Sequence, residues 1–95
     1  MMADHIDPNL KAAVERLVRE RFPDTVLDRI LIEEAVDEDG DDIVKVMVLL
    51  KERPDVSRVR GLTRRMWSDL SRQKFGFPIL SFRTTEENAR LIAAA

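Results

Sequence analysis

The sequence predicts an α+β domain of two layers, with elements in the order α-β-β-α-β-α and a three-stranded, mostly antiparallel sheet packed against helices. Three observations predict this fold: two segments with apolar residues at helical spacing, an Asp-Gly turn between two apolar runs, and the chain's size and composition. The chain has 95 residues, of which 44% are apolar and 36% charged. This is enough for one hydrophobic core, so we expect a single domain over residues 1–95, with residues 1–6 as a flexible tail.

The first helix is predicted over residues 8–21. Asp7 is a favourable N-cap, and Pro8 then falls at the first helical position, where its missing N–H is not needed. Pro23 ends the helix. Its apolar side recurs at helical spacing in Leu10, Val14, Leu17, Val18 and Phe22.

A β-hairpin is predicted next, from strands over residues 27–36 and 43–51. The six residues between them, 37–42, are Asp-Glu-Asp-Gly-Asp-Asp. Asp-Gly is a strong hairpin signal, because Gly40 adopts the positive φ that the turn requires. The acidic turn could also hold a hard cation, but it lacks the spacing of a helix-loop-helix calcium loop, and we expect no metal site there.

The second strand of the hairpin has apolar residues on both faces. Val44, Val46, Val48 and Leu50 form one face, and Ile43, Met47 and Leu49 form the other, interrupted by Lys45. We therefore expect a central strand covered on both sides, either by helices or by a second subunit. Leu31, Met47 and Leu49 are the predicted subunit-interface residues.

A second helix is predicted over residues 57–74, with Asp55 or Ser57 as N-cap and Gly76 as C-cap. Its apolar stripe consists of Val59, Leu62, Met66 and Leu70. A third strand follows over residues 79–84, and a last helix, capped by Thr84 with Glu87 or by Thr85, extends through Ala94. The third strand should run parallel to the second, since a helix connects them, and it lies beside either the first or the second strand.

The second helix carries the most specific functional signal. Its outward face has one row with Arg60 and Arg64 and another with Arg58, Arg65 and Arg72, separated by the small residues Gly61 and Ser68. Guanidinium groups in such rows can bind an acidic protein surface or a phosphate backbone. The predicted partner-binding residues are Arg58, Arg60, Arg64, Arg65, Trp67 and Arg72. No aromatic residue interleaves with the basic ones along the rest of the helix, which weakens the case for base stacking.

Charge is unevenly divided along the chain. Residues 1–50 have six basic and thirteen acidic side chains, and residues 51–95 have ten basic and five acidic ones, for a formal net charge of −2. Such a division indicates an anionic partner for the basic half, or attraction between the halves within a molecule or between subunits. The low pI of about 5.4 weighs against a dedicated nucleic-acid-binding protein.

Several function classes have little support. The chain has no Cys, no Tyr and one His, which removes thiol chemistry, disulfides and a histidine pair. His5 precedes the first helix, no nucleophile–base pair can be formed, and the three glycines are too far apart for a phosphate-binding loop. We therefore expect no enzymatic activity, no catalytic residues and no cofactor. No secretory signal or membrane-spanning run is visible, which predicts a cytoplasmic protein that does not enter the membrane.

Two resemblances bear on function. The α-β-β-α-β order is similar to the type II KH-like layout of small ribosome-assembly factors, although Gly61-Leu62-Thr63-Arg64 lacks the second glycine of the KH nucleic-acid-binding loop. The stretches 37–44, 61–65 and 77–82 resemble a group of short uncharacterised bacterial proteins. That resemblance implies a bacterial cytoplasmic protein, and a two-gene unit with a HEPN-like protein, as in toxin–antitoxin pairs.

Two function hypotheses follow. The first is a non-enzymatic protein-interaction module, antitoxin-like or homo-oligomeric, that uses the Arg-rich helix, the apolar sheet face or both to bind a protein partner or a second copy of itself. The second is an RNA-binding domain that contacts phosphates through the Arg-rich helix and whose affinity falls steeply with salt.

Overall fold

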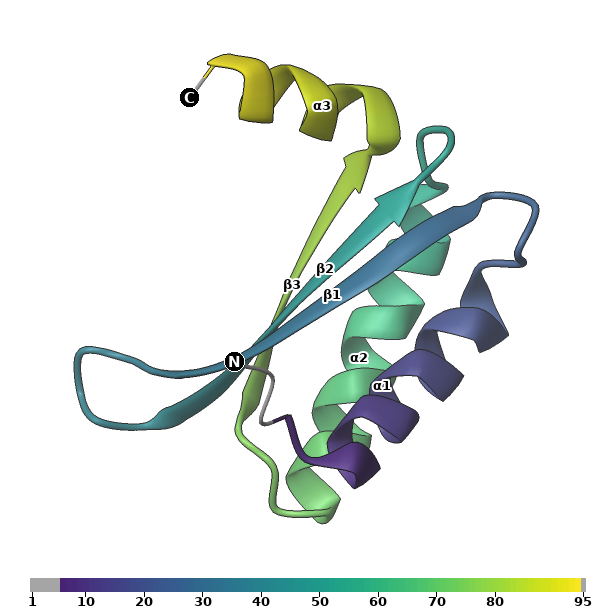
Figure 1. Cartoon of the computed structure of the whole chain (residues 1–95). Coiled ribbons are helices and arrows are strands. Elements are labelled where there is room, and N and C mark those ends of the chain that lie inside the picture. The colour runs from purple at the N-terminus through teal and green to yellow at the C-terminus, as the bar shows by residue number, and fades with distance from the viewer. Residues whose placement is uncertain (1–5, 95) are drawn as a thin grey trace.

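The structure is a computed structural model that describes residues 6–94. It contains three helices and a three-stranded sheet, and the predicted α+β class and element order are confirmed (Figure 1). The elements are α1 (Pro8–Arg21), β1 (Leu27–Val36), β2 (Asp42–Leu50), α2 (Val56–Arg72), β3 (Phe77–Thr84) and α3 (Thr85–Ala94). Residues 1–5, which include most of the expected flexible tail, lie outside the described residues, and Ile6 packs against the core.

The sheet has the order β1-β2-β3. β1 pairs antiparallel with β2, and β3 pairs parallel with β2. Of the two arrangements that the sequence left open, the third strand takes the place beside the second, so the sheet is mixed, with one antiparallel and one parallel pair. β2 is the central strand, as its two apolar faces predicted.

One face of the sheet packs against α1 and α2, which lie side by side (Figure 1). Val44, Val46, Val48 and Leu50 of β2 point into this layer and are at most 2% exposed. They pack against the apolar sides of the two helices, in particular Leu10, Val14, Leu17, Leu62, Met66 and Leu70. Burial of these side chains, at about 1.5–3 kcal/mol each before entropy costs, holds the two layers together.

Local capping signals set the helix ends. The Asp7 side chain accepts a hydrogen bond from the Asn9 N–H at 2.8 Å, with Pro8 at the start of α1. Asp55 caps α2 in the same way through the Ser57 N–H at 2.8 Å. At α3, the Thr84 hydroxyl accepts from the Glu87 N–H at 3.0 Å and the Glu87 carboxylate accepts from the Thr84 N–H at 2.9 Å. This reciprocal pair is a capping box and confirms the cap predicted for the last helix.

The end of α2 differs from the prediction that Gly76 is its C-cap. The C-cap is Gln73, and the next residue, Lys74, has a left-handed backbone with φ of 63°. The Phe75 N–H donates to the Leu70 carbonyl at 2.9 Å and the Lys74 N–H to the Ser71 carbonyl at 3.1 Å, which is a Schellman motif. Gly76 has another role: a Cβ there would lie 2.6 Å from the Asp42 carbonyl oxygen, so it allows β3 to approach β2.

The bounds of the other predicted helices and strands agree with the structure to within two residues. Gly40 has φ of 84°, as the hairpin turn requires. Within residues 6–94, every helix is too short or too polar to cross a lipid bilayer.

Candidate functional site

The second face of the sheet is not covered by α1 or α2, and we call it the open face. It is formed by alternate residues of the three strands, which lie in four rows across the sheet. In order along the strands, these rows are Arg29-Leu49-Arg83, Leu31-Met47-Ser81, Glu33-Lys45-Ile79 and Ala35-Ile43-Phe77. The middle rows line a shallow groove of about 390 Å³. The open face is therefore apolar at its centre, with charged side chains beside the groove.

Helix α3 stands at one end of this face, away from α1 and α2 (Figure 1). The Arg83 side chain, in the first row, donates a hydrogen bond to the Asn88 Oδ1 of α3 at 3.4 Å. Leu49 in the same row is 2% exposed, whereas Leu91 and Ile92 on α3 are 51% and 69% exposed. The open face is therefore covered at Leu49, next to α3, and the exposed Leu91 and Ile92 add apolar surface at its edge.

The predicted subunit-interface residues share this face but differ in accessibility. Leu31 is 43% exposed and Met47 is half-buried, but Leu49 is buried and presents almost no surface. The exposed apolar residue that the sequence analysis missed is Ile79, 48% exposed. The alternation of residues 77–82 predicts one exposed side for this strand. The sequence did not show which sheet face that side belongs to, because the strand order was open.

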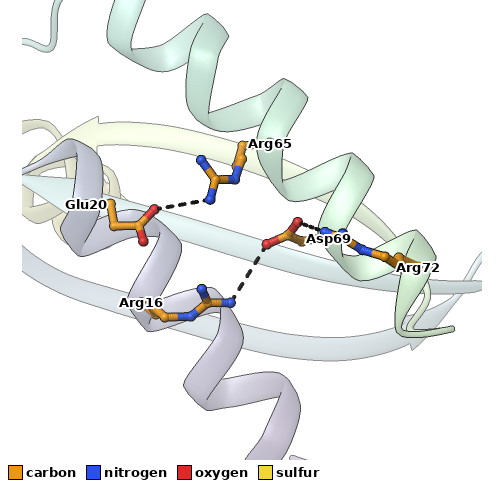
Figure 2. Close-up of polar contacts among 5 residues, drawn as sticks. All are labelled: Arg16, Glu20, Arg65, Asp69 and Arg72. Atoms are coloured by element: carbon orange, nitrogen blue, oxygen red, sulfur yellow. Dashed lines mark hydrogen bonds and ion pairs between the residues drawn. The ribbon is translucent and has the colours of Figure 1, made fainter.

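The arginines of α2 fall into two groups rather than one binding surface. Arg58, Arg65 and Arg72 lie toward α1, whose direction is opposite to that of α2. Figure 2 shows the ion pairs where α1 and α2 meet. Arg65 pairs with Glu20 at 3.9 Å, and the Asp69 carboxylate lies between Arg72 and Arg16, with Arg16 at 3.8 Å. The Asp69 side chain is 8% exposed, whereas the arginine side chains are at least half exposed. These carboxylates neutralise part of the predicted basic surface.

The space beside Gly61, between the two arginine rows, is occupied by a side chain of α1. A Cβ at Gly61 would lie 2.7 Å from the Arg21 Nη2, so the Arg21 guanidinium rests directly on the glycine. Arg58 donates to the Arg21 carbonyl at 3.4 Å. Where α1 and α2 meet near Gly61, the space between the two arginine rows is therefore filled by Arg21.

The second group faces away from α1. Arg60 and Arg64 form no ion pair with any carboxylate of residues 6–94. Trp67 continues their row and is 47% exposed. Its indole contacts the ring of Phe77 on β3, with ring centroids 5.2 Å apart and an angle of 51° between the planes. Phe77, itself 53% exposed, is a second aromatic residue that the sequence analysis did not place beside the helix.

A hollow of about 230 Å³ lies beside these two rings. Its lining residues are aromatic (Trp67 and Phe77), polar or basic (Ser71 and Lys74) and acidic (Asp41 and Asp42). Lys74 is also the left-handed residue of the Schellman motif that ends α2. The exposed rings next to hydrogen-bonding residue types make the hollow a candidate binding site.

The acidic turn lies at the far end of the hairpin. Carboxylate oxygens of Asp37, Asp39 and Asp41 come within 4.8 Å of one another. The Asp37 carboxylate accepts hydrogen bonds from the N–H groups of Asp39 and Asp41, both at 2.9 Å. These bonds account for the turn without a ligand. None of the carboxylates in this turn forms an ion pair with a basic residue of the described chain, so the turn does not neutralise the arginines of α2.

Two carboxyl groups have perturbed acidity, and both are helix caps. Hydrogen bonds from the Ser57 hydroxyl and backbone N–H lower the pKa of Asp55. The Thr84 backbone N–H and hydroxyl lower the pKa of Glu87. These shifts reflect capping rather than catalysis. His5 lies outside the described residues.

Comparison of the chain with protein-family models, curated proteins and solved structures found no match. The resemblances to KH-like proteins and to short bacterial proteins with a HEPN-like partner therefore stay predictions. Two surfaces bear on function: the open face, and the outer side of α2, which carries Arg60, Arg64 and Trp67.

Proposed function

We propose that this chain is a cytoplasmic, non-enzymatic protein-interaction module whose partner is a second copy of itself, bound through the open face. The observation that carries the proposal is the exposed apolar groove over Leu31, Met47 and Ile79, on a sheet face that α1 and α2 leave uncovered. Removal of such side chains from water is the main favourable term in association.

The charges of the open face favour one way of stacking two copies. If the two-fold axis ran along the strands, Arg29 would face Arg83 and Lys45 would face itself, which brings like charges together. If the axis runs across the strands through the second row, Leu31 and Met47 meet their own copies. Each Arg29 then faces a Glu33 of the other copy. The second arrangement closes as a dimer and forms two ion pairs.

The size of the surface indicates that α3 also takes part. Three strands spaced about 4.8 Å apart and eight residues long give a face of roughly 14 by 26 Å, or about 370 Å² in projection. A standard interface buries about 800 Å² per partner. With the axis across the strands, the exposed Leu91 and Ile92 of α3 lie near the Ala35–Ile43 end of the other copy, and they can supply part of the remaining area.

The test is the molar mass in solution over about 1–500 µM, measured by sedimentation equilibrium. We expect a dimer that is weakened at least tenfold in Leu31→Glu, where the new carboxylate meets its own copy, and in Ile79→Lys, where the new amine faces Arg83 of the other copy. Val56→Glu and Val56→Lys are the matched controls, because Val56 is a 67% exposed apolar residue away from the open face. Ile79→Lys also distinguishes face-to-face stacking from pairing of two β1 edges, which would not involve β3.

A charge swap tests the orientation. Arg29→Glu and Glu33→Arg should each weaken the dimer, and the double variant should restore it. A wild-type protein that stays monomeric over the whole range, or a dimer indifferent to both Leu31→Glu and Ile79→Lys, would overturn the proposal. Stable binding of a different protein by this face, with no self-association, would also overturn it.

A further inference from the structure

We infer that the outer side of α2 and the hollow beside Trp67 and Phe77 form a binding site for single-stranded nucleic acid. This inference does not depend on self-association, because the site lies on α2 and at the start of β3 rather than at the centre of the open face. Three features carry it: unpaired arginines, an exposed aromatic pair, and a hollow with hydrogen-bonding groups.

The basic part of the site is continuous with the aromatic part. Arg60, Arg64, Trp67 and Ser71 follow one another at spacings of three or four residues, so they form one stripe along α2. The stripe is about 16 Å long at 1.5 Å per residue. Lys74 continues it at the helix end. Basic groups therefore lie on both sides of Trp67, so they can contact the phosphates before and after a base that is stacked on this ring.

The unpaired state of these arginines separates them from the rest of the helix. Arg65 and Arg72 pair with Glu20 and Asp69, and Arg58 donates to a carbonyl oxygen. Arg60 and Arg64 form no ion pair within residues 6–94, and their planar groups match phosphate oxygens. Phosphate contacts of this kind supply affinity without sequence preference.

The aromatic pair supplies what phosphate contacts cannot, a surface for bases. Trp67 and Phe77 are each about half exposed although they touch one another. Stacking on such rings contributes about 1–3 kcal/mol per base and tolerates every base. A protein segment could also pack apolar side chains on the two rings, but an acidic segment would meet Asp41 and Asp42 at the hollow, whereas a neutral base with amino groups would not be repelled by them. Nucleic acid therefore fits the whole site better.

The hollow limits what can enter it. At about 230 Å³, it lies below the range of roughly 300–1,000 Å³ usual for drug-sized ligands. It therefore suits one base rather than a whole nucleotide. Asp41 and Asp42 line it, and carboxylates accept hydrogen bonds from the exocyclic amino groups of cytosine and adenine. Uracil has no amino group and presents carbonyl oxygens, so it should bind less well.

Binding is measured with octamers of rA, rC and rU at 20–200 mM salt. Trp67 is the only tryptophan and there is no tyrosine, so quenching of intrinsic fluorescence reports contact at this ring. We expect quenching, tighter binding of rC and rA than of rU, and a salt slope of about −2 for three neutralised phosphates. Anisotropy of labelled octamers gives the affinities of variants that lack Trp67.

Two variants and one control complete the test. Arg60→Ala/Arg64→Ala should weaken binding about tenfold or more and reduce the salt slope to about −0.7, since one cation remains. Trp67→Leu should weaken binding about fivefold or more with the slope unchanged. Arg53→Ala/Arg90→Ala removes two exposed cations elsewhere and should have little effect.

Three results would overturn the inference. The first is the absence of binding at 20 mM salt. The second is equal binding of octaglutamate and the octamers without fluorescence quenching, which would assign the arginines to an acidic protein. The third is equal loss of affinity in the control and the Arg60→Ala/Arg64→Ala variant. Circular dichroism of each variant shows whether it is folded.

Discussion

Replacement of Lys74 by glycine should make the protein more stable and at the same time weaken its binding of nucleic acid. Lys74 holds the left-handed position of the Schellman motif, with φ of 63°. An L-residue pays about 1–2 kcal/mol for this conformation, and glycine does not. Glycine loses about 0.5–1 kcal/mol through its freer unfolded chain. The net expectation for Lys74→Gly is a gain of about 0.5–1 kcal/mol.

This gain is large enough to measure by thermal unfolding. For a domain of this size, 1 kcal/mol shifts Tm by about 4–8 °C, so we expect an increase of about 2–8 °C. Lys74→Ala is the matched variant, because it removes the amine but keeps the Cβ that causes the strain. It should leave Tm nearly unchanged. Both variants should weaken octamer binding by a similar factor and reduce the salt slope by about 0.7, because each loses one phosphate contact.

The reasoning fails if Lys74→Gly is no more stable than the wild type. That result would mean that contacts of the lysine side chain compensate the backbone strain within the fold. It also fails if the glycine variant is stabilised but binds octamers as the wild type does, because the lysine would then have no part in the site. Stabilised and weaker-binding protein is the combination expected where strain is retained for function.

Three further predictions concern the fold. Gly76→Ala should destabilise the protein by about 1–3 kcal/mol in urea unfolding, because the new Cβ would meet the Asp42 carbonyl. Unchanged stability of this variant would contradict the close approach of β3 to β2. Asp69→Ala should cost about 1–2 kcal/mol, less than the roughly 3–5 kcal/mol typical of breaking a fully buried ion pair, since Arg16 and Arg72 stay exposed to water. Asp69→Leu should recover most of this cost by filling the same space, and a larger loss in the leucine variant would contradict this account of Asp69. Glu87 has a lowered pKa in the folded state, so its contribution to stability is complete above the ordinary pKa of 4.5 and is lost as the pH falls below that value. The stability difference between wild type and Glu87→Gln should be visible at pH 7 and absent near pH 2. A difference that persists in acid would refute the role of the Glu87 carboxylate in the cap.

The parts of the fold that could be predicted from sequence are those with local signals. Asp7 and Pro8 specify the start of α1, and Gly40 specifies the hairpin turn, because each acts on residues within a few positions of itself. The bounds of α1 and β1 accordingly agree with the predicted ranges 8–21 and 27–36.

The strand order could not be predicted, because the apolar pattern of residues 77–84 is satisfied equally beside β1 or β2. The end of α2 was predicted from glycine preference alone, but the chain places Lys74 in the left-handed position so that Phe75 donates to the Leu70 carbonyl. The choice between Lys74 and Gly76 depends on where β3 must start, which is a property of the whole sheet.

The candidate site was found only in part. The row of Arg60, Arg64 and Trp67 follows from helical spacing. Phe77 lies on another element, and only the reversal of the chain after α2 brings its ring to Trp67. Pairing of Arg65 with Glu20 likewise depends on the packing of α1 against α2, which no local pattern specifies. The Arg72–Asp69 pair is different, because it joins residues three positions apart on α2 and its spacing can be read from the sequence.

The separation of charge between the two helices and the hairpin turn has a practical consequence for purification. Helices α1 and α2 hold nine basic residues and three acidic ones, whereas the turn at residues 37–42 holds five carboxylates. Ion-exchange resins respond to the surface that faces them rather than to the formal charge of −2. At neutral pH and low salt the protein should therefore be retained on anionic and cationic columns alike, in opposite orientations.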